Sequence, residues 1–386
     1  MAKENRKWLY IIGLTAFVIY IFIAPRSIPV ETVLAPRWIT SLESNYPVNF
    51  SNALADDNEP LLPFTLGNRF GYLANDGKFA INQIMDGYVS ISENLWAEYE
   101  ALPSSIKIRN PHNEEILVIE DPKGYPFFLD NRVFIVGSEQ NSITALSQAG
   151  EELWTHDFPA PLTCVDAAGG YLLAGTLDGV VELLDFKGSL VFTPFEPGGS
   201  RLAVILGCAI SQDASRLAMI SGVEQQRFLL LERSGTERSR TESPKTEGNR
   251  TEGSKTEGSD TYKVVYHEFL SDGFRRPVFI RFINDDAQII FEREEGLGIF
   301  TIGSRTSTKV NLEGEITALD DSGENGFLFL ITSQGQNEKR FIAIRHPGLI
   351  VNETPFKSKN AFLARKRDRI YLGGDLLMAS FELEKN

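Results

Sequence analysis

Short apolar segments separated by turn residues recur along most of the chain. Residues 170–197 show the pattern, with runs rich in β-branched and aromatic residues at 171–176, 180–186 and 190–195. The breaks between them contain Asp178-Gly179 and Lys187-Gly188, and glycine tolerates the positive φ that a tight hairpin requires. Together with the preceding run, 162–167, these segments predict a four-stranded antiparallel meander.

One run of this kind, which we assign to the second strand of each meander, returns at regular intervals. The seven runs begin at Tyr88, Arg132, Tyr171, Arg216, Gln288, Phe327 and Arg369. All intervals but one are near the roughly 40 to 45 residues of a four-stranded propeller blade. The sequence therefore predicts an all-β fold, a seven-bladed β-propeller.

The ends of the chain decide how such a ring closes. The last repeat, from Asn360, has room for three strands, and a ring left open there would expose a strand edge. We expect residues 70–74 to pair with 376–383 and supply the fourth strand. The alternative is eight blades, with residues 64–92 as a separate blade.

The one long interval contains an insertion at residues 236–260. It is a five-residue repeat of alternating charge with Gly, Ser and Pro. Without large apolar side chains it cannot bury enough surface to offset the entropy of ordering. We expect a disordered low-complexity loop within the fourth blade, tolerated at a loop tip, with a polyvalent ligand or modification site as the alternative.

The N-terminal residues predict an anchor. Residues 8–24 carry no charge, and a helix of that length just spans a thin hydrocarbon core. Basic residues precede it, which favours a cytoplasmic N-terminus. We expect residues 1–24 to form a cytoplasmic tip and transmembrane helix, the proline-containing residues 25–67 an extended linker, and 68–386 a periplasmic or extracellular propeller. A cleavable signal peptide is the alternative, although Pro25 directly follows Ala24.

Composition excludes several functions. A net charge of −14 argues against sequence-independent nucleic-acid binding, which needs a cationic face. Two cysteines exclude a disulfide-rich scaffold and a multi-cysteine zinc site. Cys164 and Cys208 occupy matching places in the first strands of neighbouring blades, and we expect them to be free, buried thiols.

Parts of three repeats resemble known propeller families. Residues 133–138 and 145–154 resemble the repeat of the pyrroloquinoline-quinone-like (PQQ-like) β-propellers, in which a Val-Gly-Ser strand precedes an Ala-Leu…Gly…Trp turn. Residues 211–218 are similar to the turn of WD40- and TolB-type blades. The fold also resembles outer-membrane assembly propellers, whose lipoprotein cysteine this sequence lacks.

The resemblance implies a fold and does not extend to a cofactor. Ser147 stands where the PQQ-like repeat usually has Asp, and the docking tryptophan appears in one blade only, as Trp154. The vicinal cysteine pair and a calcium-ligating set are also missing from the sequence. We therefore expect no cofactor and no metal.

The candidate binding residues lie in the connections from one blade to the next. They are Arg201, Arg275, Arg276, Lys357 and Lys359. Arginines beside glycines near the channel mouth could receive a carboxylate or phosphate in a bidentate manner. The alternative is that they are solvated or paired with neighbouring acids.

No residue set predicts acid–base, nucleophilic or metal chemistry, and the four histidines show no paired spacing. We therefore expect a protein that is not an enzyme: a membrane-anchored extracytoplasmic scaffold that binds unknown protein partners and no nucleic acid. The alternatives are a channel-site enzyme or small-molecule sensor, which perturbed acids converging on a channel pocket would favour, and a purely structural spacer.

Overall fold

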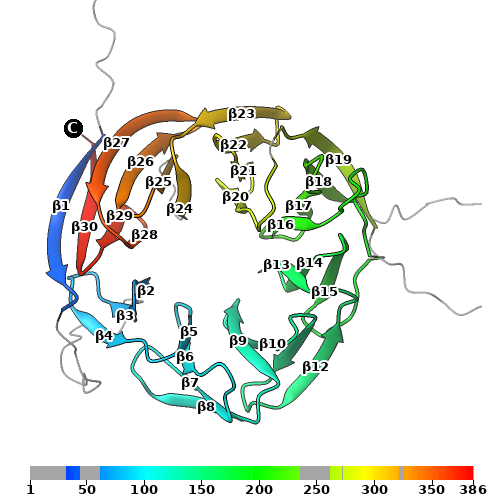
Figure 1. Ribbon diagram of the computed structural model, residues 1–386, viewed down its shortest axis with the longest axis horizontal. Coiled ribbons are helices and arrows are strands. Elements are labelled where there is room, and N and C mark those ends of the chain that lie inside the picture. The colour runs from blue at the N-terminus through cyan, green and yellow to red at the C-terminus, as the bar shows by residue number, and fades with distance from the viewer. Residues whose placement is uncertain are drawn as a thin grey trace, which may run out of the picture.

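A computed structural model describes residues 32–43, 61–192, 194–234, 261–271, 273–320 and 326–385. In these residues the chain is entirely β, with 30 strands in eight antiparallel sheets. The sheets stand around a central axis as the blades of a propeller (Figure 1). The prediction of seven blades is therefore wrong, and the eight-blade alternative has the correct number.

Blades are numbered here in chain order. Blade 1 contains β2 (Leu62–Leu66), β3 (Arg69–Leu73) and β4 (Phe79–Ile84). Blade 2 contains β5 (Tyr88–Ile91), β6 (Trp96–Tyr99), β7 (Ser105–Arg109) and β8 (Glu115–Glu120). Blade 3 contains β9 (Gly124–Leu129), β10 (Arg132–Gly137), β11 (Ser142–Leu146) and β12 (Glu152–Asp157). Blade 4 contains β13 (Leu162–Ala168), β14 (Tyr171–Thr176) and β15 (Val181–Asp185), with Leu190 and Phe195 bridged to β15.

The second half of the ring is more regular. Blade 5 contains β16 (Ile205–Ile210), β17 (Arg216–Ser221), β18 (Arg227–Ser234) and β19 (Thr261–Phe269). Blade 6 contains β20 (Ile280–Ile283), β21 (Gln288–Arg293), β22 (Gly296–Thr301) and β23 (Thr306–Asn311). Blade 7 contains β24 (Glu315–Asp320), β25 (Phe327–Gln334), β26 (Glu338–Arg345) and β27 (Leu349–Lys357). Blade 8 contains β28 (Ala361–Lys366), β29 (Arg369–Gly374), β30 (Leu377–Lys385) and, from the N-terminal part of the chain, β1 (Thr32–Ser41).

The ring closes between the two ends of the described chain, but through a different strand from the one expected. β1 pairs antiparallel with β30 from Thr32↔Lys385 to Ser41↔Leu377. The expected partner, residues 70–74, belongs almost entirely to β3 and pairs with β2 and β4. Both β1 and β2 fall within residues 25–67, the segment expected to be a linker.

Blade 1 differs from the others in the direction of its strands. Its β2–β3 turn lies beside the start of β28, because a Cβ on Gly67 would stand 3.0 Å from the Asn360 side chain. Its β3–β4 turn lies on the other side of the ring, where Arg369 donates to the carbonyl of Asn75 at 2.9 Å. β2, β3 and β4 therefore run like the second, third and fourth strands of a regular blade, and a short link leads from β4 directly into β5.

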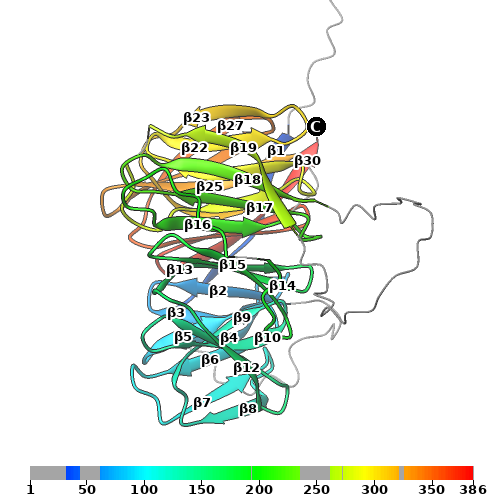
Figure 2. The same ribbon diagram turned by 90° about the vertical axis from the view of Figure 1, so that its right-hand side faces the viewer.

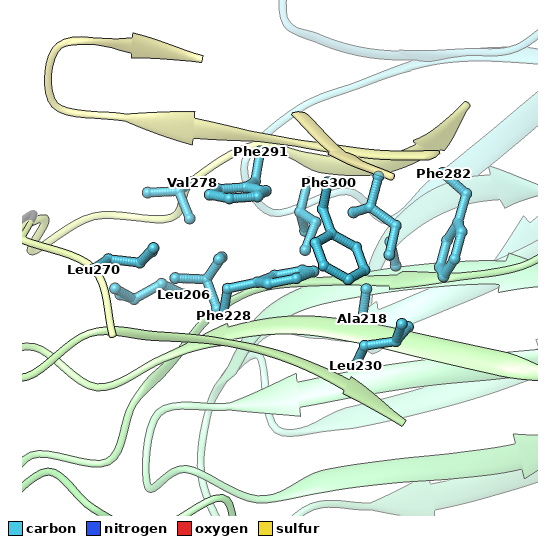
Figure 3. Close-up of a cluster of buried hydrophobic side chains, with 13 residues drawn as sticks. Leu206, Ala218, Phe228, Leu230, Leu270, Val278, Phe282, Phe291 and Phe300 are labelled. Carbon is cyan, nitrogen blue, oxygen red and sulfur yellow. The ribbon is translucent and has the colours of Figure 1, made fainter. Parts of the chain in front are cut away.

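The interfaces between blades hold the core. Between blades 5 and 6, Phe228 stacks on Phe291 with ring centroids 4.8 Å apart and contacts Phe300 at 5.3 Å (Figure 3). Gly298 makes room for this stack, because a Cβ there would lie 2.4 Å from the Phe291 ring. These interlocking aromatics make the boundary between blades 5 and 6 rigid.

The expected transmembrane helix and single-pass localisation are corrected. The described part of the chain contains no helix long and apolar enough to cross a membrane. Residues 8–24, on which the expectation rested, lie outside the described residues, as do residues 236–260 of the insertion.

Candidate interaction face

The connections between blades and the turns between second and third strands lie on one face of the ring. Arg201, between blades 4 and 5, pairs at 2.9 Å with Glu224 in the β17–β18 turn, and Ser358, between blades 7 and 8, donates its N–H to the Asn337 carbonyl at 2.9 Å. We call this side the connection face.

The opposite face holds the ends of the described chain. β1 begins at Thr32 there, beside Lys385, the last described residue, and β18 ends there at Ser234. Seen from the edge of the disc, the labelled C-terminal end stands on one side of the ring (Figure 2). All five candidate binding residues lie on the connection face, on the other side.

Arg276 is held by two glutamates and is not free to receive a ligand. Its guanidinium donates to both carboxylate oxygens of Glu292, at 3.0 and 2.7 Å, and lies 3.2 Å from Glu315. It also stacks over the Phe274 ring, 5.0 Å from the centroid. The hydrogen bonds that Arg276 donates to Glu292 and the charge of both glutamates raise the pKa of Arg276. Because the Glu292 side chain is 7% exposed, Arg276 neutralises an otherwise buried charge.

The other predicted cations are not brought together. Arg201 pairs with Glu224, whereas Arg275, Lys357 and Lys359 have exposed side chains in two separate connections. The five residues therefore form no single anion site.

The surroundings of Arg276 are more acidic than the sequence suggested. A cleft of about 340 Å³ opens beside it on the connection face. It is lined by Phe274, Arg276, Glu292, Arg293, Glu294, Gly314, Glu315 and Ile316. Sequence reasoning missed its glutamates, although the run Glu292 to Glu295 after an apolar strand marks a charged strand end.

Exposed apolar side chains gather at the turns and strand ends of the connection face. They are Ile84, Tyr88, Leu102, Leu177, Leu202, Phe269, Leu376 and Leu377, between 41% and 89% exposed. The other large hydrophobic residues exposed in the described chain lie along outer strands: Ile39, Ile116, Leu153, Leu190, Val264, Leu349, Ile350 and Val351. The connection face thus presents apolar tips on blades 1, 2, 4, 5 and 8.

The central channel is lined by the first strand of each regular blade. Asp166, Arg281 and Asp320 occupy equivalent places, each opposite the third residue of its neighbouring second strand. Asp166 accepts the N–H of Ile210 in the next blade at 2.9 Å, and Asp320 likewise accepts the N–H of Arg365 at 2.7 Å. These two aspartates therefore tie one blade to the next.

A cleft of about 330 Å³ in the channel wall spans blades 4 to 6. It includes Asp166 and Asp286. Burial raises the pKa of both carboxyls, and the neighbouring Asp213 and Asp285 add to the effect at Asp286. Two carboxyl groups with raised pKa values in one concave site are the feature that ligand binding or catalysis in the channel would require.

The two cysteines lie where the sequence placed them, in the first strands β13 and β16. Both are free in the structure, with Cys208 buried and Cys164 partly so. Burial, followed by the nearby Cys164 thiol, raises the pKa of Cys208 far above its usual range. Among the residues that the structure describes, no group of three or more His, Cys, Asp and Glu side chains is arranged to hold a metal.

A ring of antiparallel sheets closed by strands from both ends defines the class of the protein, a β-propeller. A family model described as a beta-propeller protein matches residues 1–239 and 256–386, so the chain belongs to this family. The narrower resemblance to PQQ-like and TolB-type blades stays a prediction.

The chain is also similar to two other proteins. A protein of Treponema pallidum (strain Nichols), described as uncharacterized, is 21% identical over 385 residues, which cover 99% of this chain and 95% of that protein. The crystal structure of BamB from Moraxella catarrhalis is similar with a TM-score of 0.53 and 12% identity, covering 91% of this chain and all of that one. At this identity the likeness to BamB shows the fold alone.

Proposed function

We propose that the protein is a scaffold that binds another protein through its connection face. The observation that carries the proposal is the set of apolar tips on that face, headed by Leu102 at 89% exposed. Exposed apolar groups that collect on one side of a rigid body mark interaction sites more often than scattered single residues do. Arg275, Lys357 and Lys359, which are exposed on the same face, belong to the proposed surface.

Site-specific photocrosslinking in the native cells tests the proposal. A photoreactive amino acid replaces Leu102 or Leu202 on the connection face. Ile116 in β8 and Leu153 in β12, which are 51% and 54% exposed, serve as matched controls on outer strands near the opposite face. We expect both connection-face positions to capture the same protein and the controls not to capture it. Equal capture from the controls, or none from Leu102 and Leu202, would contradict the proposal.

The channel cleft supports a second candidate, a small-molecule sensor. Such a sensor would need carboxyl groups with shifted pKa values in a concave site, and Asp166 and Asp286 in the channel cleft both have raised pKa values. The inter-blade hydrogen bond from Ile210 to Asp166 also has a structural explanation, since Asp320 makes the equivalent bond at another blade boundary. The scaffold remains the better supported function, because no such structural role accounts for the apolar tips.

A further inference from the structure

Three tyrosines from two blades lie in a row on the connection face. Tyr88 opens β5, Tyr99 closes β6 and Tyr125 lies at the start of β9. Consecutive ring centroids are 6.0 and 5.8 Å apart, with interplanar angles of 24° and 31°. Leu102, in the β6–β7 turn, follows Tyr99 closely in the chain. We call these four residues the tyrosine patch.

We propose that the tyrosine patch docks an extended, arginine-containing segment of a protein partner. This inference rests on the proposed scaffold function and specifies where and what the scaffold binds. Its physical basis is the fixed row of rings together with the charge around them.

Hydrogen bonds hold the rings of Tyr99 and Tyr125 in place before any partner arrives. The Tyr125 hydroxyl donates to the Ala101 carbonyl at 3.1 Å, which ties blade 3 to the β6–β7 turn. The Tyr99 hydroxyl lies 3.2 Å from the Ser90 hydroxyl, which itself donates to the Pro126 carbonyl at 2.5 Å. Such preorganisation lowers the entropy that binding costs.

The ring spacing matches an extended chain. Alternate side chains of a segment in extended β-strand geometry lie on one face and are about 6.6 Å apart, since each residue rises about 3.3 Å. Rings about 6 Å apart therefore meet alternate side chains of such a segment. Aromatic rows of this kind recognise extended proline-containing peptides, whose low conformational entropy favours binding.

The charge around the patch selects a basic partner. The segments that carry the patch, residues 84–88, 98–104 and 121–125, contain four acidic residues and a single basic one, Lys123. Asp86, Glu100 and Asp121 are exposed, and the Asp121 N–H bonds to the Ser104 carbonyl beside Leu102 at 2.9 Å. Arginine suits both features, because its planar guanidinium stacks on tyrosine and pairs with carboxylates.

The test measures binding of a fluorescent synthetic peptide of alternating proline and arginine to the full chain. A peptide with glutamate in place of each arginine is the charge control. Leu102→Asp and Tyr88→Ala remove contacts from exposed side chains that the fold does not need, and Leu153→Asp is the matched control variant. Glu100→Lys reverses one charge at the rim.

We expect the basic peptide to bind and the acidic peptide not to bind. Leu102→Asp and Tyr88→Ala should each weaken binding about tenfold, whereas Leu153→Asp should leave it unchanged. Glu100→Lys should weaken binding and reduce its dependence on salt. Unchanged melting temperatures would show that the variants stay folded.

Several results would overturn the inference. One is equal binding of both peptides, and another is equal affinity in the wild type and Leu102→Asp. A third is sedimentation of the wild type as a dimer that Leu102→Asp dissociates, which would make the patch a contact between two copies. If the basic peptide does not bind while Leu202 still crosslinks to a partner, the patch assignment fails and the scaffold proposal stands.

Discussion

Arg276 shows how far single residues can be interpreted from sequence. Its place in a connection between blades was predictable, because it follows Gly273 between two strand patterns. Its partner was not, since sheet pairing brings Glu292, which lies 16 positions further along the chain, beneath it. An arginine that the sequence alone presents as a binding residue for anions is therefore ion-paired with a glutamate of the protein itself.

Arg275 and Arg276 provide a matched test of this assignment. Arg276→Ala leaves the Glu292 carboxylate without its bidentate partner, so unfolding free energy should fall by about 2 kcal/mol, less than for a fully buried pair because Arg276 is partly exposed. Arg275→Ala removes an exposed side chain and should change little. Thermal and denaturant unfolding of both variants checks this. Equal stability of the two would mean that the Arg276–Glu292 contact contributes nothing.

At the scale of elements, most second strands follow from the sequence. Six of the seven predicted second strands, from β10 onward, have that role in the structure. The remaining predicted second strand, which begins at Tyr88, is β5, the first strand of blade 2. The strands of blade 2 are short and half-exposed and give a weak pattern, and the true second strand of this blade begins at Trp96.

Blade 1 and the closing strand were missed for a related reason. The segment 25–67 is interrupted by prolines, which argue against central strands. β1 nevertheless forms as an outer strand, where a proline is tolerated, and its register shifts between Pro36 and Trp38. Only the tertiary pairing with β30 reveals it.

Trp38 anchors β1 to its neighbours. Its indole N–H donates to the Asn75 carbonyl at 2.9 Å, and its ring lies 6.0 Å from that of Tyr371. Trp38→Ala should therefore lower unfolding free energy by about 3 kcal/mol. Arg37→Ala, which removes an exposed pair with Glu382, should cost less than about 1 kcal/mol. Denaturant unfolding compares them, and equal losses would mean that the indole does not fasten the strand.

At the scale of the whole molecule, the repeat predicted a propeller and the joining of its two ends. The number of blades depended on blade 1, whose strands run in an unusual direction and whose spacing to blade 2 is short. The arrangement of the two faces follows from the ring, because closure places the ends of the described residues on one side and the blade connections on the other. Apolar tips on the connection face become a surface only in that arrangement.

Disulfide trapping of ring closure tests this account most directly. In a chain whose Cys164 and Cys208 are replaced by serine, cysteines are placed at Leu34 and Leu383 or at Ala35 and Glu382, which are paired residues of β1 and β30. The Cα–Cα distance alternates between consecutive residue pairs of two antiparallel strands. At least one of the two cysteine pairs should therefore oxidise readily to a disulfide. A control chain carries cysteines at Tyr72 and Ser380, which would meet if β3 closed the ring. The account predicts a disulfide between β1 and β30 and none in the control, whereas a disulfide in the control alone would contradict it.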